Sequence, residues 1–157
     1  MPLPSIASQT PKTASHDVTI SMYEKGRSFI MAGGLVKAYE GHKFVYLHLL
    51  CQGLECIGKA LLLKHDYQKY APMLRKSFGH DLAALVSEIH TTSRTTLVCD
   101  DALQELTQLN HFYKTHILRY GNASDLIKES SQLSANFLHR DLVACLDTLN
   151  EQFSPHE

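Results

Sequence analysis

The segment from about Lys43 to His65 constrains the fold most, because as a helix it would be apolar around most of its circumference. Two adjacent apolar stripes run along it at helical spacing, made up of Leu47, Leu50, Leu54, Ile57 and Leu61 and of Leu49, Cys56, Ala60 and Leu63. A helix with so little polar surface must be covered by other helices. The pattern therefore predicts a helix at the centre of a bundle.

Helical spacing also runs through most of the remaining chain. Prolines gather in the first eleven residues and return only at Pro72 and Pro155, so long stretches are free to be helical. Three further long helices and one short helix are expected, over about 18–40, 97–120 and 130–153 and after Gly79. We therefore predict an all-α fold, an up-and-down bundle of four long helices plus one short helix.

The length of 157 residues fits one domain, which we expect to occupy residues 18–157. The preceding segment 1–17 is rich in Pro, Ser and Thr, and we predict that it is flexible. It lacks the basic and apolar regions of a secretory signal, and no uninterrupted apolar run approaches the roughly 18 residues of a membrane span. The four cysteines form no CxxC pair. Together these features predict a soluble cytoplasmic protein with reduced thiols and no membrane partner.

The charge pattern narrows the classes of partner. A formal net charge of −1 gives the chain no overall attraction to nucleic acid, so any RNA contact must come from a local patch. Ten histidines are present, but no HExxH occurs and no obvious pair has metal-ligand spacing. The sequence therefore predicts neither a metal site nor a cofactor.

Four polar residues interrupt the apolar surface of the central segment. His48, Gln52, Glu55 and Lys59 follow one another at steps of four, three and four and so share one helical face. One interpretation is a solvated strip with an ion pair between Glu55 and Lys59. The other is a polar groove that faces a neighbouring helix. The sequence alone favours the solvated strip, because polar stripes are commoner at the surface.

Three groups of residues, in chain order, form a larger pattern. Glu55, Lys59, Ala60 and Leu62 give E-x-x-x-K-A-x-L, His80, Asp81, Leu82 and Leu85 give H-D-L-x-x-L, and Tyr113, Arg119, Tyr120 and Gly121 are similar to Y…R-Y-P with glycine in place of proline. This set resembles the HEPN family (higher eukaryotes and prokaryotes nucleotide-binding domain). The resemblance extends over about residues 18–153.

The resemblance implies a helical bundle that forms a homodimer and takes part in nucleotide or RNA transactions. Many HEPN members have a nucleotidyltransferase partner or belong to defence or toxin–antitoxin systems. Active members are metal-independent ribonucleases with an R-x4–6-H motif late in the bundle. On this basis the chain is expected to be a nucleotide- or RNA-associated binding module.

The residues expected for ribonuclease chemistry are incomplete. No histidine follows Arg119 at the required spacing, and His116 lies three residues before it. Arg75 and His80 match R-x4-H as a string, but outside the late helix. His and Arg suit such chemistry because imidazole titrates near neutrality while guanidinium stays charged. We therefore expect a catalytically degenerate module, with an active ribonuclease and a protein-interaction bundle as alternatives.

Two sets of candidate site residues follow. The catalytic candidates are His80, Arg75, His116 and Arg119, and the ligand-binding candidates are Glu55, Lys59, Arg119 and Tyr120. The same residues also fit a purely structural network, because buried polar groups must find partners.

Overall fold

A computed structural model describes residues 11–120 and 133–154, and within them the chain is helical with no β-strand. This confirms the all-α prediction. The elements in chain order are α1 (Pro11–Ala38), α2 (Lys43–His65), α3 (Tyr67–Tyr70), the π-helical turn η1 (Leu74–Phe78), α4 (Leu82–Ser93), α5 (Asp100–Lys114), α6 (Ile117–Tyr120) and α8 (Asn136–Phe153).

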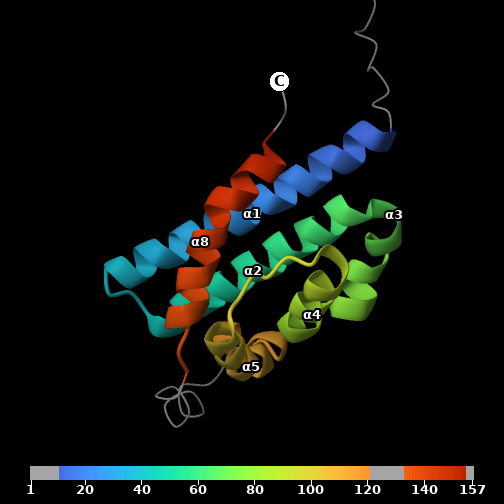
Figure 1. Cartoon of the computed structure of the whole chain (residues 1–157). Helices are drawn as coiled ribbons and strands as arrows, with labels where there is room; N and C mark the ends of the chain where they lie inside the picture. The colour runs from blue at the N-terminus through green and yellow to red at the C-terminus, as the bar shows by residue number, and fades with distance from the viewer. Residues whose placement is uncertain (1–10, 121–132, 155–157) are drawn as a thin grey trace, which may run out of the picture.

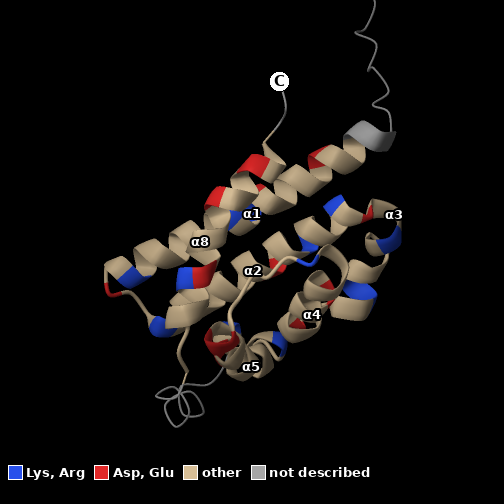
Figure 2. Ribbon diagram, viewed as in Figure 1, with Lys and Arg blue, Asp and Glu red and all other residues tan. Residues whose placement is uncertain are grey.

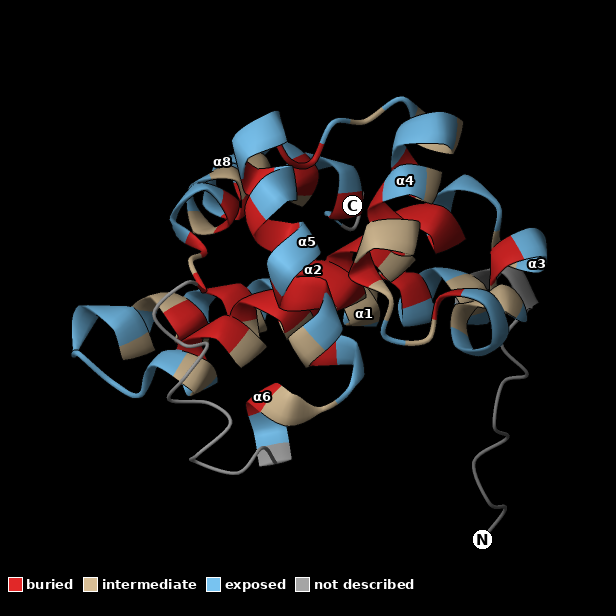
Figure 3. Ribbon diagram, turned by 90° about the horizontal axis from the view of Figure 1, so that it is seen from below, coloured by how far each residue is buried: buried red, intermediate tan, exposed pale blue. Residues whose placement is uncertain are grey.

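Helix α2 lies at the centre of the fold, as its apolar stripes predicted. Figure 3 shows its middle buried, with α4, α5 and α6 on the sides that α1 leaves open. Leu50, Leu54 and Ile57 have no exposed surface. By length and composition α2 would also suit a membrane span, but 67% of that stretch is buried inside the protein. A buried core helix satisfies the same criteria, and here neighbouring helices supply the cover.

Helices α1 and α2 run side by side, joined by a short turn, and α8 crosses α1 (Figure 1). Glycines let the first two helices approach closely. A Cβ atom on Gly53 would lie 2.5 Å from Cγ1 of Ile30 and 3.0 Å from the carbonyl oxygen of Gly26. The crossing of α8 is fixed by the stacked rings of Tyr23 and Phe153, whose centroids are 4.4 Å apart.

The first helix starts earlier than the predicted position of about residue 18, within the segment 1–17 that was predicted to be flexible. The helix begins at Pro11, so residues 11–17 are helical, while residues 1–10 lie outside the described part. Proline suits the first position of a helix, because the amide hydrogen it lacks would have had no helical partner there. The Ser- and Thr-rich composition misled the prediction at this end.

The predicted helix over 97–120 is also corrected, since it is two helices. Cys99 caps α5 through its thiol, which accepts from the amide of Ala102 at 3.5 Å, and α5 ends at Lys114. His116 then has a positive φ of 62°, which no α-helix accommodates. The apolar spacing continues across this break, so the pattern concealed it.

Two smaller differences concern the connections. Residues 66–78, where no helix was predicted, contain α3 and η1, and Gly79 ends η1 with a φ of 49°. The last predicted helix began at 130, but α8 begins at Asn136, and residues 130–132 lie outside the described part.

Candidate functional site

A buried carboxylate connects three parts of the fold. Glu55 of α2 is 7% exposed and accepts hydrogen bonds from Lys59 Nζ at 2.6 Å, from His80 Nδ1 at 3.0 Å and from the Tyr113 hydroxyl at 2.5 Å. Burial opposes ionisation, but the hydrogen bonds from His80, Lys59 and Tyr113 outweigh it and hold the pKa of Glu55 below its ordinary value. Glu55 is therefore an ionised hub.

This arrangement overturns the interpretation of the α2 polar residues as a solvated strip. The side chains of Lys59 and Glu55 are only 13% and 9% exposed and face other elements of the fold. The ion pair at i,i+4 is present, but it lies between helices instead of on the surface. The alternative of a polar face directed at a neighbouring helix describes α2 correctly.

Lys59 also fixes the turn that precedes α4. Its Nζ donates to the carbonyl oxygen of Gly79 at 2.8 Å, at the residue whose positive φ ends η1. Next to it, the Asp81 carboxylate caps α4 by accepting from the amide of Ala84 at 3.1 Å. Asn110 of α5 binds the same carboxylate at 3.0 Å. His80 is thus held on both sides by anchored residues.

Two histidine rings meet beside this hub. The ring of His80 lies edge-on to that of Tyr113, with centroids 5.8 Å apart, and to that of His116, with centroids 5.0 Å apart. The His80 side chain is 45% exposed, and His116 is partly buried. His80 therefore reaches from the buried Glu55 carboxylate to the protein surface, with His116 beside it.

A third histidine also contacts the ring of Tyr113. The rings of His48 and Tyr113 are 5.7 Å apart, and Nδ1 of His48 is buried without a hydrogen-bond partner in the described structure. Burial, followed by the nearby charge of Arg119, lowers the pKa of His48. His48 is consequently neutral at neutral pH, whereas Arg119, which is exposed on α6, brings positive charge to this side of the cluster.

The predicted site residues do not all converge. Glu55, Lys59, His80 and His116 lie together, and Arg119 lies close enough to His48 to affect its pKa. Arg75 is exposed on η1 and its side chain makes no hydrogen bond or ion pair with any described residue, so the R-x4-H string forms no cluster. The side chain of Tyr120 lies outside the described part.

Sequence reasoning did not assign three contributors to the candidate sites. Tyr113 was only a motif residue, although its hydroxyl binds Glu55 and its ring contacts the rings of His48 and His80. The carbonyl group of Gly79 was missed because no sequence pattern reports a backbone acceptor. The α2 spacing that placed His48 beside Glu55 was the one available signal for His48.

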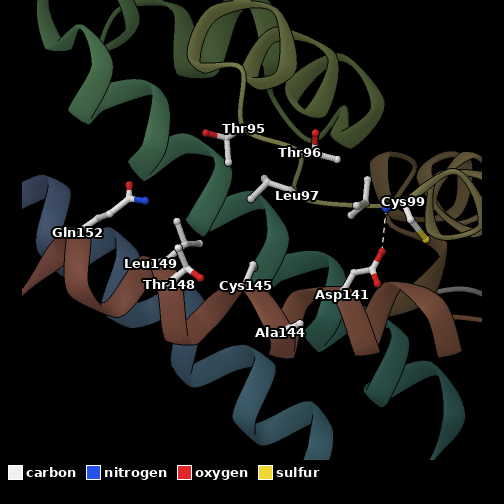
Figure 4. Close-up of a pocket in the computed structure, with 11 residues that line it drawn as sticks. Thr95, Thr96, Leu97, Cys99, Asp141, Ala144, Cys145, Thr148, Leu149 and Gln152 are labelled. Carbon is white, nitrogen blue, oxygen red and sulfur yellow. Dashed lines mark hydrogen bonds between the residues drawn. The ribbon is translucent and has the colours of Figure 1, made fainter.

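A separate pocket of about 410 Å³ lies between the 95–99 connection and α8 (Figure 4). Asp141 spans its end by accepting from the amide of Cys99 at 2.7 Å. Burial raises the pKa of the Cys145 thiol to about 11, so this thiol is protonated at neutral pH. None of the hub residues lines the pocket, and the candidate site is therefore the histidine cluster.

The distribution of charged residues does not indicate a particular ligand. Figure 2 shows Lys, Arg, Asp and Glu spread over the helices without a face of one sign in that view. Within residues 11–120 and 133–154, no group of three or more His, Cys, Asp or Glu is placed to hold a metal ion.

The chain matches no known family model, no curated protein and no solved structure. What the site can do must follow from its own chemistry.

That chemistry is proton transfer and anion contact at a partly open surface. The ionised Glu55 can only accept, so His80 carries a proton on Nδ1 and presents Nε2 on the other side of its ring. The ring of His116 is in direct contact with the ring of His80. Arg119 supplies a permanent positive charge nearby.

Proposed function

We propose that this chain is a HEPN-like, catalytically degenerate binding module that recognises the phosphate of a nucleotide or of RNA. The observation that carries the proposal is the convergence on Glu55. The three segments that resemble HEPN motifs meet there, through Lys59, His80 and Tyr113, although they lie far apart in the sequence. Chance motif matches on unrelated surfaces would not be expected to share one hydrogen-bonded centre.

The placement of charge supports an anionic ligand. Glu55 and Lys59 neutralise each other inside the fold. The Glu55 carboxylate is therefore not an unpaired negative charge that would repel an anionic ligand. Arg119 and the two outer imidazoles, His80 and His116, then face a ligand as a cation and as hydrogen-bond donors. Protonation of either ring would strengthen the attraction.

The wider assignments belong to the same proposal. We infer an up-and-down HEPN-like bundle that forms a homodimer in the cytoplasm, as an accessory to a nucleotidyltransferase or to a defence or toxin–antitoxin system. The missing histidine after Arg119 supports the degenerate form, because acid–base cleavage needs a correctly placed proton acceptor.

Thermal unfolding with and without ligand tests the binding function. AMP, inorganic phosphate and a short single-stranded RNA should each raise the melting temperature, because a ligand that binds only the folded state stabilises it. His116→Asn and Arg119→Gln should reduce the shift, whereas His111→Asn, at an exposed position on α5, should leave it unchanged. A melting temperature unmoved by all three ligands contradicts the proposal and favours a protein-interaction bundle.

An active ribonuclease is the second candidate, and one observation favours it. A carboxylate that holds one nitrogen of a histidine leaves the other free to take a proton, and His116 lies beside it as a second proton carrier. RNA cleavage in EDTA that is lost in His80→Asn and in His116→Asn, with unchanged circular dichroism, would establish this candidate. It would also overturn the degenerate assignment.

A further inference from the structure

Two imidazole rings with this spacing have a second possible use. The centroids of His80 and His116 are 5.0 Å apart and their planes are inclined by 77°. A tetrahedral ion with metal–nitrogen bonds of about 2.1 Å holds two imidazole centroids roughly 5 Å apart. The two planes are steeply inclined, so the rings are not stacked face to face.

We propose that His80 and His116 together bind one divalent transition-metal ion of the type that prefers imidazole, such as Zn²⁺, Ni²⁺ or Cu²⁺, with water as the remaining ligands. Imidazole nitrogen suits these ions, whereas Mg²⁺ and Ca²⁺ require oxygen ligands. The described residues offer no group of three ligand side chains, so this is a two-histidine site with open positions.

Glu55 prepares His80 for this role. Metal-binding histidines generally donate their second ring nitrogen to a carboxylate or carbonyl group, which fixes the ring and raises its basicity. Nδ1 of His80 donates to Oε2 of Glu55 at 3.0 Å, and Glu55 is itself held by Lys59 and Tyr113. Nε2 of His80 is therefore the nitrogen left for an ion, and the half-exposed side chain leaves a path from solvent.

His116 supplies the second ligand from a strained position. Its φ of 62° is uncommon for a residue other than glycine, and such backbone strain concentrates at functional sites. Within the described part of the chain its ring nitrogens have no hydrogen-bond partner, although the ring is partly buried. A metal ion would use a nitrogen that residues 11–120 and 133–154 leave without a hydrogen bond.

The surrounding charges favour a moderate, exchangeable affinity. Glu55 offsets the ion's charge through His80, while Arg119 opposes it from the side of His48. The metal and a phosphate would compete for the same two rings. The metal site rests on ring geometry and not on the proposed phosphate function, so either can fail while the other stands.

Calorimetric titration of the tag-free full chain with ZnCl₂, and separately with NiCl₂, tests the site. One ion per chain is expected, and MgCl₂ should give no binding. His80→Asn and His116→Asn should each weaken Zn²⁺ binding at least tenfold. Asparagine retains an amide near the position of Nδ1 at 80 and tolerates positive φ at 116, so both variants should fold. Glu55→Gln should weaken binding about 10- to 100-fold, the usual effect of removing such a supporting carboxylate.

His111→Asn is the matched control, because His111 is exposed on α5 only five residues from His116 and its ring contacts Phe112 instead of the cluster. It should bind Zn²⁺ as the unmodified protein does. Absence of Zn²⁺ and Ni²⁺ binding overturns the proposal. So does an affinity that is unchanged in the His80→Asn and His116→Asn variants, or lowered equally in His111→Asn. Phosphate binding, measured on the same variants without metal, reports on the proposed function independently.

Discussion

Two faces of α2 pack against their neighbours in different ways. Gly53 and Glu55 are two residues apart and so point to nearly opposite sides of the helix. On the Gly53 side α1 approaches so closely that an added Cβ would lie 2.5 Å from Ile30. On the Glu55 side a carboxylate collects hydrogen bonds from Lys59, His80 and Tyr113. The first contact depends on shape, and the second depends on every polar group having a partner.

Only one of these two faces of α2 can support a function. A glycine-lined contact has no group that can bind a ligand or exchange a proton, so it only stabilises the fold. The polar contact costs desolvation, which its hydrogen bonds must offset. In return it holds His80 at the surface in a defined orientation. Substitutions on the two faces should therefore have different consequences.

Glu55→Ala should have the largest effect. It removes the shared acceptor and leaves the Lys59 ammonium and the Tyr113 hydroxyl unpaired in a buried site. Breaking a buried ion pair in this way typically costs about 3–5 kcal/mol of folding free energy. Urea denaturation followed by circular dichroism measures the loss. Glu24→Ala at an exposed position of α1 should change stability by no more than about 0.5 kcal/mol, and equal effects of the two variants would contradict the hub.

Gly53→Ala tests the other face and should have a smaller effect. The new methyl group would lie 2.5 Å from Cγ1 of Ile30 and 3.0 Å from the Gly26 carbonyl oxygen, so α1 must shift. Overpacking of this kind costs about 1–3 kcal/mol. The His80 environment, followed by its NMR signals, should stay the same because the polar face is untouched.

Gly34→Ala is the control for that substitution. Its Cβ would lie 3.6 Å from Nε2 of His139, an ordinary contact distance. Alanine favours helix over glycine by about 1 kcal/mol, so this variant should be unchanged or more stable. If Gly53→Ala were as stable as Gly34→Ala, the close approach of α1 and α2 would be wrong.

The same contrast explains what could be predicted from the sequence. The central place of α2 follows from its apolar circumference, a property of one segment by itself. The environment of Glu55 does not, because Tyr113 and His80 lie 58 and 25 residues away. A polar stripe on a helix has the same spacing whether water or another helix faces it. The break at His116 was hidden for a related reason, since the apolar spacing runs on while the backbone turns.

The smallest effect, and the most specific, is the dependence of stability on pH. Because the folded-state pKa of Glu55 lies below the ordinary value of 4.5, its ionised form stabilises the fold above that value. The contribution should disappear as the pH falls through the folded-state pKa. Urea denaturation of the unmodified protein and of Glu55→Gln at pH 6, 4.5 and 3 (roughly spanning a carboxyl titration) measures the difference in unfolding free energy.

Other carboxylates titrate in both proteins and cancel in that difference, as do changes in the net charge they share. The stability advantage of the unmodified protein should therefore narrow towards pH 3. An advantage that stayed constant or widened on acidification would mean that Glu55 is not held in its ionised form by Lys59, His80 and Tyr113, and the polar face of α2 would then differ from the apolar face only in composition.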